Sequence, residues 1–298
     1  MHSPQPGRDV RAPIIERPDS LSLDSNVVLR TGHEMPLLGL GTWMLTTHTA
    51  ESVQHALELG YRMVDTSADY LTQPGVGHAV RRHSAPRESL FIVMKVEEND
   101  DGHAATVKNL DDLKLAYADL VLIHRAPKKG VGEKVFRGLM RARDEALVRD
   151  IGVCSYKIEQ LRELADATGE MPAVHQIEWS PFGHSLDMLN FCRAHGIVVQ
   201  AYSPLTRGKR LGDKRLGELA RKHGKTPAQI ILRWNLEWGV VPMPKAYRVD
   251  HQCENLELFD FDLDAVDMAT LDGMNEQFSA LDKLEYLPEP AGQRGKDQ

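Results

Sequence analysis

Four residues in the first half of the chain have side chains suited to proton transfer: Asp65, Tyr70, Lys95 and His124. Asp65 and Tyr70 lie five residues apart in GYRMVDTSADY, where Asp65 follows an apolar run. Lys95 ends the apolar run FIVMK, and His124 ends LVLIH. A cation beside a tyrosine favours the phenolate, which lowers the tyrosine pKa from about 10 toward neutral pH. A carboxylate beside that cation keeps both groups charged, since each offsets the desolvation of the other.

The elements that must position these residues are strands of a parallel sheet. Apolar runs predict strands at residues 37–43, 61–67, 90–96, 120–124, 151–155, 174–179, 197–202 and 240–244. Amphipathic segments between them predict helices, several of which end at a glycine such as Gly60. Eight strand–helix units match a (β/α)8 TIM barrel, whose usual size is about 250 residues. Because the C-terminal ends of barrel strands face one mouth, the four residues are expected to meet there.

Further parts of this α/β fold are expected at the two ends of the chain. A β-hairpin is predicted around Thr31-Gly32, and an extra helix is predicted at 262–274. The predicted organisation is a flexible N-terminal arm (residues 1–25), a single barrel domain (26–281) and a C-terminal tail (282–298). A doubly wound sheet is the structural alternative, but it normally carries a G-x-G-x-x-G turn after its first strand. Gly39-Leu40-Gly41 lacks the third glycine of that motif, which favours the barrel.

The composition argues against several classes of partner. The chain has 298 residues and a net charge of −7, which disfavours nucleic acids and anionic membranes as partners. No apolar run approaches the roughly 20 residues that span a bilayer, and the first 25 residues lack the apolar core of a signal peptide. Its 3 cysteines are far apart, without metal-ligand spacing. A cytoplasmic protein with reduced thiols is therefore expected. The sequence leaves the oligomeric state open, with a monomer as the expectation.

From Val27 to Leu281 the sequence resembles the aldo-keto reductase family, and its short loops resemble those of bacterial members. The resemblance implies an NAD(P)H-dependent oxidoreductase that reduces an aldehyde or ketone to an alcohol without a metal. It also implies the roles of the tetrad. Tyr70 would donate the proton and Lys95 would lower the Tyr70 pKa. Asp65 would pair with Lys95, and His124 would orient the carbonyl group.

The resemblance implies a cofactor site, with NADPH expected and NADH as the alternative. Cys154 and Ser155 stand where the family usually has Ser and Asn, and His251 stands where it often has Arg. His251 lacks the planar fork of a guanidinium, which Arg248 would have to supply. The expected cofactor-binding residues are Gly41, Thr42, Trp43, Asp65, Cys154, Ser155, Gln176, Tyr202, Ser203, Leu205, Lys245, Ala246, Arg248, His251, Glu254 and Asn255.

The expected substrate pocket contains Trp43, Tyr70, His124, Arg125 and Trp179. Arg125 replaces a frequent family Trp, and it would either attract an anionic substrate or remain a solvated rim charge. Trp179 would either wall the pocket or pack at the rim. Two other functions stay open at this point: a non-catalytic nicotinamide-binding regulator on the same barrel, and a barrel lyase or isomerase that uses Asp65 and His124 without redox chemistry.

Overall fold

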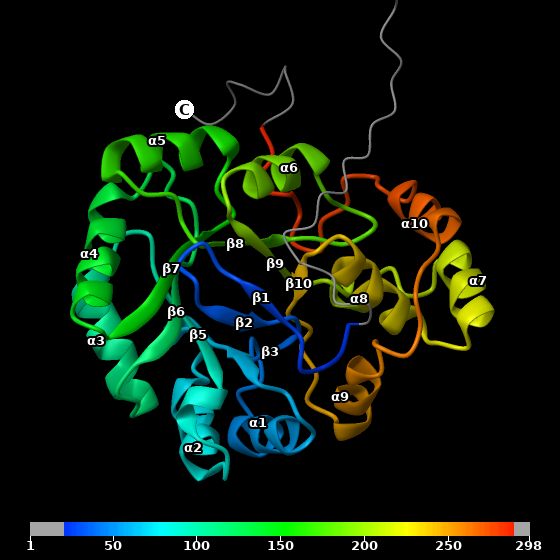
Figure 1. The fold of residues 1–298 in the computed structure, drawn as a ribbon, viewed down its shortest axis with the longest axis horizontal. Coiled ribbons are helices and arrows are strands. Elements are labelled where there is room, and N and C mark those ends of the chain that lie inside the picture. Colours follow the sequence, from blue (N-terminus) through cyan, green and yellow to red (C-terminus); the bar gives the residue numbers. More distant parts are fainter. Residues whose placement is uncertain (1–20, 289–298) are drawn as a thin grey trace, which may run out of the picture.

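A computed structural model of the protein describes residues 21–288, in which eight parallel strands alternate with helices around a barrel (Figure 1). Its strands follow one another in chain order, each hydrogen-bonded to the next along the sheet: β3 (Gly39–Gly41), β4 (Met63–Asp65), β5 (Phe91–Val96), β6 (Ala118–Ile123), β7 (Val148–Cys154), β8 (Val174–Glu178), β9 (Val198–Tyr202) and β10 (Val241–Pro242). Between the first and last strands, the backbone amide of Gly41 donates to the carbonyl of Pro244 at 3.0 Å. The predicted (β/α)8 barrel is confirmed, although β10 is shorter than the predicted strand 240–244.

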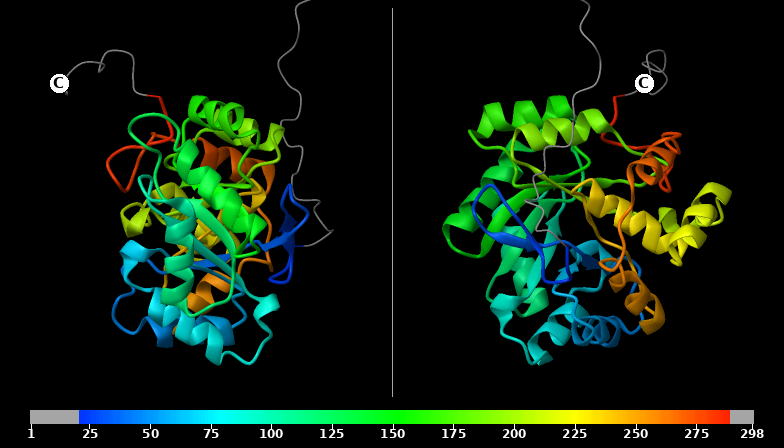
Figure 2. Two further views of the ribbon diagram at one scale, coloured as in Figure 1. Left: turned by 90° about the vertical axis from the view of Figure 1, so that its left-hand side faces the viewer. Right: turned by 45° about the vertical axis from the view of Figure 1, so that its right-hand side comes forward.

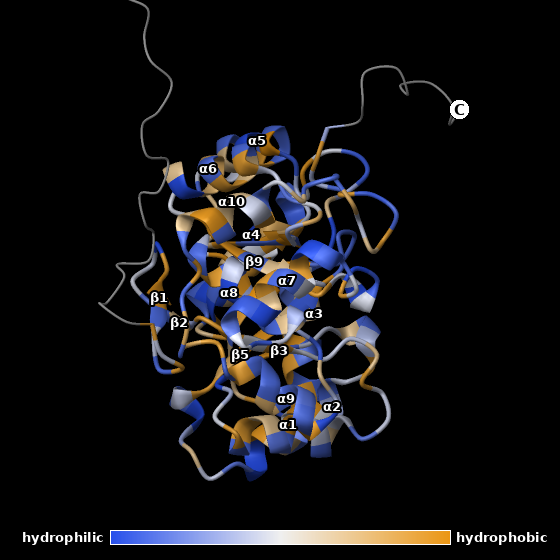
Figure 3. Ribbon diagram, turned by 90° about the vertical axis from the view of Figure 1, so that its right-hand side faces the viewer, coloured by the Kyte–Doolittle hydropathy of each residue, from blue (hydrophilic) through white to orange (hydrophobic). Residues whose placement is uncertain are grey.

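Ten α-helices surround the strands in the described part of the chain. They are α1 (Thr49–Glu58), α2 (Gln73–Arg82), α3 (Gly102–Leu113), α4 (Glu133–Asp144), α5 (Ile158–Thr168), α6 (Leu186–Ala194), α7 (Lys214–His223), α8 (Pro227–Glu237), α9 (Val249–Leu256) and α10 (Ala265–Asp272). Along them hydrophobic and hydrophilic residues alternate (Figure 3), as expected for helices with one face on the barrel. Three short 3₁₀ turns are also present: η1 (Ala68–Tyr70), η2 (Arg87–Ser89) and η3 (Thr206–Gly208).

The core follows directly from the apolar strand runs. Every residue of β5 and β6 is buried, which is expected for parallel strands that have the barrel interior on one face and helices on the other. Within residues 21–288, no helix combines the length and apolarity needed to cross a membrane.

The predicted hairpin is present and lies at one end of the barrel. Its strands β1 (Asn26–Val28) and β2 (Glu34–Pro36) pair antiparallel, and Gly32 in the turn has a φ of 88°, which favours glycine. Thr31 and His33 contact Asp150, which lies near the start of β7. The hairpin therefore covers the N-terminal end of the strands. Most of the predicted N-terminal arm lies outside the described residues.

The C-terminal segment crosses the opposite end of the barrel (Figure 2). Glu178, at the end of β8, accepts hydrogen bonds at 2.6 Å from the hydroxyl of Ser279 and the amide of Ala280. Leu284 and Tyr286 are buried. Residues 282–288, assigned by sequence to a tail, thus pack against the barrel, and residues 289–298 lie outside the described part.

Candidate active site

Asp65 and Lys95 form a buried ion pair at the C-terminal ends of neighbouring strands. Asp65 ends β4 and Lys95 lies one residue before the end of β5. The Lys95 ammonium lies 2.5 and 2.6 Å from the two carboxylate oxygens of Asp65. Burial opposes the charge of Lys95, but its pKa is nevertheless raised because Asp65 and Tyr70 together favour the ammonium. Lys95 therefore stays charged in a region that excludes water.

Tyr70 ends the turn η1, and its ring lies beside this pair. The Lys95 nitrogen is 5.0 Å from the centre of the Tyr70 ring. Burial raises the pKa of Tyr70, and the attraction of Lys95, which acts in the lowering direction, does not compensate for it. The groups in the structure thus do not bring the Tyr70 pKa toward neutral pH as expected, because burial outweighs the effect of Lys95 and the charge of Asp65 also acts in the raising direction. A raised pKa keeps the phenol protonated, which is the form that donates a proton.

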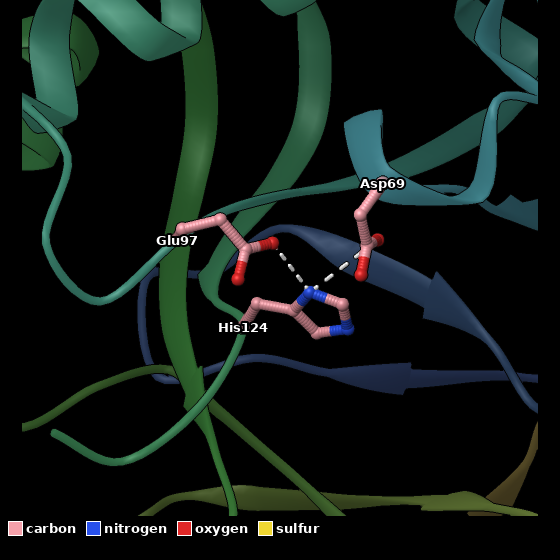
Figure 4. Close-up of side chains that lie close together, drawn as sticks. All are labelled: Asp69, Glu97 and His124. Carbon is pink, nitrogen blue, oxygen red and sulfur yellow. Dashed lines mark hydrogen bonds and ion pairs between the residues drawn. The ribbon is translucent and has the colours of Figure 1, made fainter. Parts of the chain in front are cut away.

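His124 follows β6 and faces Tyr70 with one ring nitrogen and two carboxylates with the other. Its Nε2 lies 3.4 Å from the Tyr70 hydroxyl, and the two rings meet edge to face. Its Nδ1 lies 2.8 Å from Glu97 and 3.6 Å from Asp69 (Figure 4). The structure therefore brings all four residues of the predicted tetrad to one mouth of the barrel.

A cavity of about 790 Å³ opens at this mouth. Its lining includes three of the four tetrad residues, together with most of the residues expected at the nicotinamide end. From the predicted sets it contains Gly41, Trp43, Asp65, Tyr70, His124, Arg125, Cys154, Ser155, Gln176, Tyr202, Ser203, Leu205 and Lys245.

Two loops on one side of the cavity hold backbone conformations that favour glycine but are occupied by other residues. Ser155 after β7 has a φ of 58°, and Ser203 after β9 has a φ of 47°. The hydroxyl of Ser155 lies 3.2 Å from that of Tyr202. The buried imidazole of His175 holds the first loop by accepting a hydrogen bond from the amide of Tyr156 at 3.0 Å. Such strained positions concentrate at ligand sites.

Gln176 and Cys154 have less freedom to bind a ligand than the sequence suggested. The amide nitrogen of Gln176 donates to Asp65 and to Gln200, each at 2.9 Å, so its carbonyl oxygen is the group left to accept. Burial raises the pKa of the Cys154 thiol to about 12. Cys154 therefore contributes a neutral wall and a weak donor.

The far end of the cavity carries cations beside Trp43. Arg207 lies over the Trp43 ring at 4.0 Å, and Lys245 lies 5.8 Å from the same ring. Lys245 forms no salt bridge within residues 21–288. Arg248, by contrast, pairs with Asp250 on the surface. A phosphate would bind directly at Lys245, whereas Arg248 would first have to leave Asp250.

The remaining expected cofactor residues do not line the cavity. Thr42 is buried and donates to the Asp65 carbonyl at 2.8 Å, so it supports the end of β4. Ala246 is buried within the loop before α9. On α9, His251 is exposed, Glu254 accepts a hydrogen bond from Thr226 at 2.5 Å, and Asn255 is buried.

Two of the expectations for the substrate pocket need correction. Trp179 is completely buried and stacks on Trp234 with ring centres 5.9 Å apart, so it packs in the core and does not wall the cavity. Arg125 does line the cavity, but its guanidinium already binds Glu97 at 2.7 Å and Asp69 at 3.1 Å. An anionic substrate would have to compete with both carboxylates for Arg125.

Sequence reasoning missed several residues of this region, among them Asp69, Glu97, Arg207, Leu281 and Glu285. The sequence did contain a signal for Glu97. Residues two apart on an extended chain point to the same face, and Glu97 lies two residues after Lys95. Asp69 directly precedes Tyr70. Leu281 and Glu285 line the cavity from the C-terminal segment, whose path over the mouth had no local sequence signal.

Comparisons with known proteins give a consistent result. The family model described as "Aldo/keto reductase family" matches residues 37–276. A glyoxal reductase of Bacillus subtilis (strain 168) is 37% identical over 261 residues, which cover 86% of this chain and 94% of that protein. A methylglyoxal reductase of Escherichia coli (strain K12) is 37% identical over 244 residues, which cover 80% and 89%. A Bombyx mori aldo-keto reductase solved in complex with NADP superposes with a TM-score of 0.80 at 29% identity, covering 88% and 96%.

Proposed function

The chain belongs to the aldo/keto reductase family, and from this premise we propose that it reduces small aldehydes with Tyr70 as the general acid. It is an oxidoreductase that reduces carbonyl compounds with NADPH. The observation that carries the proposal is the 3.4 Å contact between Tyr70 and His124 at the cavity wall, beside the buried Asp65–Lys95 pair. Protonated phenol and imidazole groups at one point of a cavity are suited to bind and protonate a carbonyl oxygen.

In this proposal each tetrad residue has a separate task. Tyr70 donates its proton to the carbonyl oxygen. Lys95 stabilises the phenolate that remains, because its buried ammonium lies close to the Tyr70 ring. Asp65 keeps Lys95 charged and fixed. His124 binds the carbonyl oxygen next to Tyr70, which orients the carbonyl carbon for reduction.

The residues along the cavity fit NADPH. When bound, NADPH supplies the hydride that the carbonyl carbon receives. Ser155 and the Gln176 carbonyl oxygen would hold the carboxamide of the nicotinamide, and Tyr202 would stack on its ring. At the other end, Lys245 has no salt bridge within the described residues and would bind a phosphate.

Two observations support small neutral carbonyl compounds as substrates. Relatives at 37% identity are named for the reduction of glyoxal and methylglyoxal. In addition, Arg125 is shared between Glu97 and Asp69. Two carboxylates and one guanidinium leave this wall without a free positive charge to attract an acid.

The proposal is tested by following NADPH oxidation with methylglyoxal, glyoxal and the acidic aldehyde glyoxylate. We expect turnover with the two neutral compounds and a lower kcat/KM for glyoxylate. Tyr70→Phe should abolish turnover and leave NADPH binding, measured by fluorescence titration, within about twofold, because the ring remains in place. Tight NADPH binding without turnover of any carbonyl compound by the native protein would instead support a nicotinamide-binding regulator.

A further inference from the structure

The side of His124 that faces away from Tyr70 contacts Glu97, which has no task in the chemistry above. Glu97 lies directly after β5, two residues beyond Lys95, and it is not among the residues that line the cavity within the described part of the chain. Its Oε1 lies 2.8 Å from Nδ1 of His124 (Figure 4). Glu97 therefore acts on the reaction through the side chains that it contacts, which are the imidazole of His124 and the guanidinium of Arg125.

Hydrogen-bond chemistry determines which nitrogen of the ring carries a proton. An ionised carboxylate only accepts hydrogen bonds, so a bond to Glu97 requires a proton on Nδ1 of His124. In the neutral ring, Nε2 is then the unprotonated nitrogen, and in the charged ring Nε2 is also protonated. Nε2 lies 3.4 Å from the Tyr70 hydroxyl. The nitrogen that gains or loses a proton is thus the one that faces the reacting groups.

Arg125 holds Glu97 in this role. Its guanidinium binds the second oxygen of Glu97 at 2.7 Å and reaches Asp69 at 3.1 Å. The hydrogen bond with His124 lowers the pKa of Glu97, which keeps Glu97 ionised at neutral pH. The carboxylate is therefore fixed at both oxygens, one on Arg125 and one on His124.

We propose that Glu97 is a positioning residue that keeps a proton on Nδ1 of His124, so that only Nε2 exchanges protons with Tyr70. The inference rests on the proposed role of Tyr70 as the general acid. When the Tyr70 O–H bond breaks, the carbonyl oxygen gains that proton. The Nε2–H bond of the charged His124 then breaks as the Tyr70 O–H bond re-forms, and Nε2 is reprotonated by the one solvent proton that the overall reduction consumes.

Several charged or titratable groups surround His124, and Glu97 makes the shortest contact among them. Asp69 lies 3.6 Å from Nδ1, and Tyr70 faces Nε2 from the same turn η1. Lys95 lies on β5 beneath the Tyr70 ring, and Arg125 follows His124 in the chain. On the neighbouring β7, Cys154 is a neutral thiol, because burial raises its pKa to about 12. Removing the charge of Glu97 should destabilise the doubly protonated ring more than removing that of any other carboxylate.

A direct test observes the ring nitrogens of His124 by ¹⁵N NMR of histidine-labelled protein. The chain has 13 histidines, so the His124 signals are assigned by their loss in His124→Gln. We expect the neutral ring of the native protein to carry its proton on Nδ1, and the Glu97→Gln variant to show a mixture of tautomers. A native ring protonated on Nε2 alone, or an unchanged spectrum in Glu97→Gln, would overturn the proposal.

A kinetic test measures kcat/KM for methylglyoxal reduction from pH 5 to 9 at saturating NADPH. Without the carboxylate, the activity of Glu97→Gln should fall at a pH about one unit lower, because an opposite charge at this range shifts titration by one to three units. The native protein and the variant should then differ by less than about twofold well below both midpoints and by about tenfold above the native midpoint.

The matched control is Glu98→Gln, which removes the same charge one residue away. No hydrogen bond within residues 21–288 joins Glu98 to His124, so we expect its pH profile to match that of the native protein. An equal shift in both variants would mean that general charge, and not the contact of Glu97 with His124, sets the profile. The NMR result is independent of turnover, so failure of the Tyr70 assignment and failure of the Glu97 assignment are distinguishable.

Discussion

Two ion clusters flank the Tyr70–His124 pair, and they differ in their contact with water. On one side, the Asp65 and Lys95 side chains are 6% and 1% exposed. On the other side, Glu97, Asp69 and Arg125 are 31%, 38% and 51% exposed. Because the first cluster is buried, each of its two charges requires the other, since neither charge is tolerated there alone. Solvent partly screens the charges of the second cluster. Substitutions there should therefore change the activity with only a small loss of folding stability.

The largest effect is expected from breaking the buried pair. Asp65→Asn leaves the Lys95 ammonium without its partner, and this should lower the free energy of unfolding by about 3–5 kcal/mol. Chemical denaturation monitored by tryptophan fluorescence measures this loss. The double variant Asp65→Asn/Lys95→Met removes both charges and should recover much of the stability, but not the activity. If Asp65→Asn alone had the same free energy of unfolding as the native protein, the two residues would not form a buried pair of charges.

A smaller effect is expected from Arg125→Ala in the exposed cluster. Half-exposed ion pairs contribute about 0–1 kcal/mol, so the free energy of unfolding should change by less than about 1 kcal/mol. Because Glu97 loses its second partner, kcat/KM for methylglyoxal should fall by several-fold. The preference for neutral over acidic aldehydes should stay unchanged, because Arg125 is already engaged by Glu97 and Asp69. A specific loss of activity toward glyoxylate would instead restore Arg125 as a binding site for anionic substrates.

The smallest effect concerns the stability of the exposed cluster at acid pH. The hydrogen bond with His124 lowers the pKa of Glu97 below its usual 4.5. A lowered folded-state pKa means that Glu97 stabilises the fold above its unfolded pKa, and that this contribution is lost as the pH falls through the folded value. The melting temperature of Glu97→Gln should therefore lie slightly below that of the native protein at pH 6. The difference should shrink as the pH falls below 4.5, and a constant difference from pH 3 to 6 would contradict this origin.

The buried cluster could be predicted from sequence, whereas in the exposed cluster only Glu97 had a signal, its two-residue spacing from Lys95. Asp65, Lys95 and His124 each end an apolar run, and the geometry of a parallel barrel brings the ends of its strands to one mouth. Glu97, Asp69 and Arg125 lie just beyond the strands, where their directions depend on the local path of each loop. The sequence therefore suggested Arg125 as a free cation, while the structure shows it bound to two carboxylates.

At the cofactor end of the cavity, the sequence likewise predicted some residues of the site but not their side-chain contacts. Lys245 was predicted from a motif and lies at the cavity. The pairing of Arg248 with Asp250 depends on side-chain contacts that strand and helix patterns do not encode. Likewise, Trp179 follows β8 directly, so its sequence position suggested the mouth, but its ring turns into the core against Trp234. Strand ends are predictable from periodicity, but side-chain directions beyond them depend on tertiary packing.

The central claim is that Tyr70 delivers the proton during reduction. A single-turnover experiment tests it most directly: NADPH bound to excess enzyme is mixed with saturating methylglyoxal, and its absorbance is followed for the native protein and Tyr70→Phe. We expect both proteins to bind NADPH with similar affinity. The rate of NADPH oxidation in Tyr70→Phe should be about 10²–10⁴-fold lower, the usual contribution of a general acid. An oxidation rate within tenfold of the native value would contradict the account.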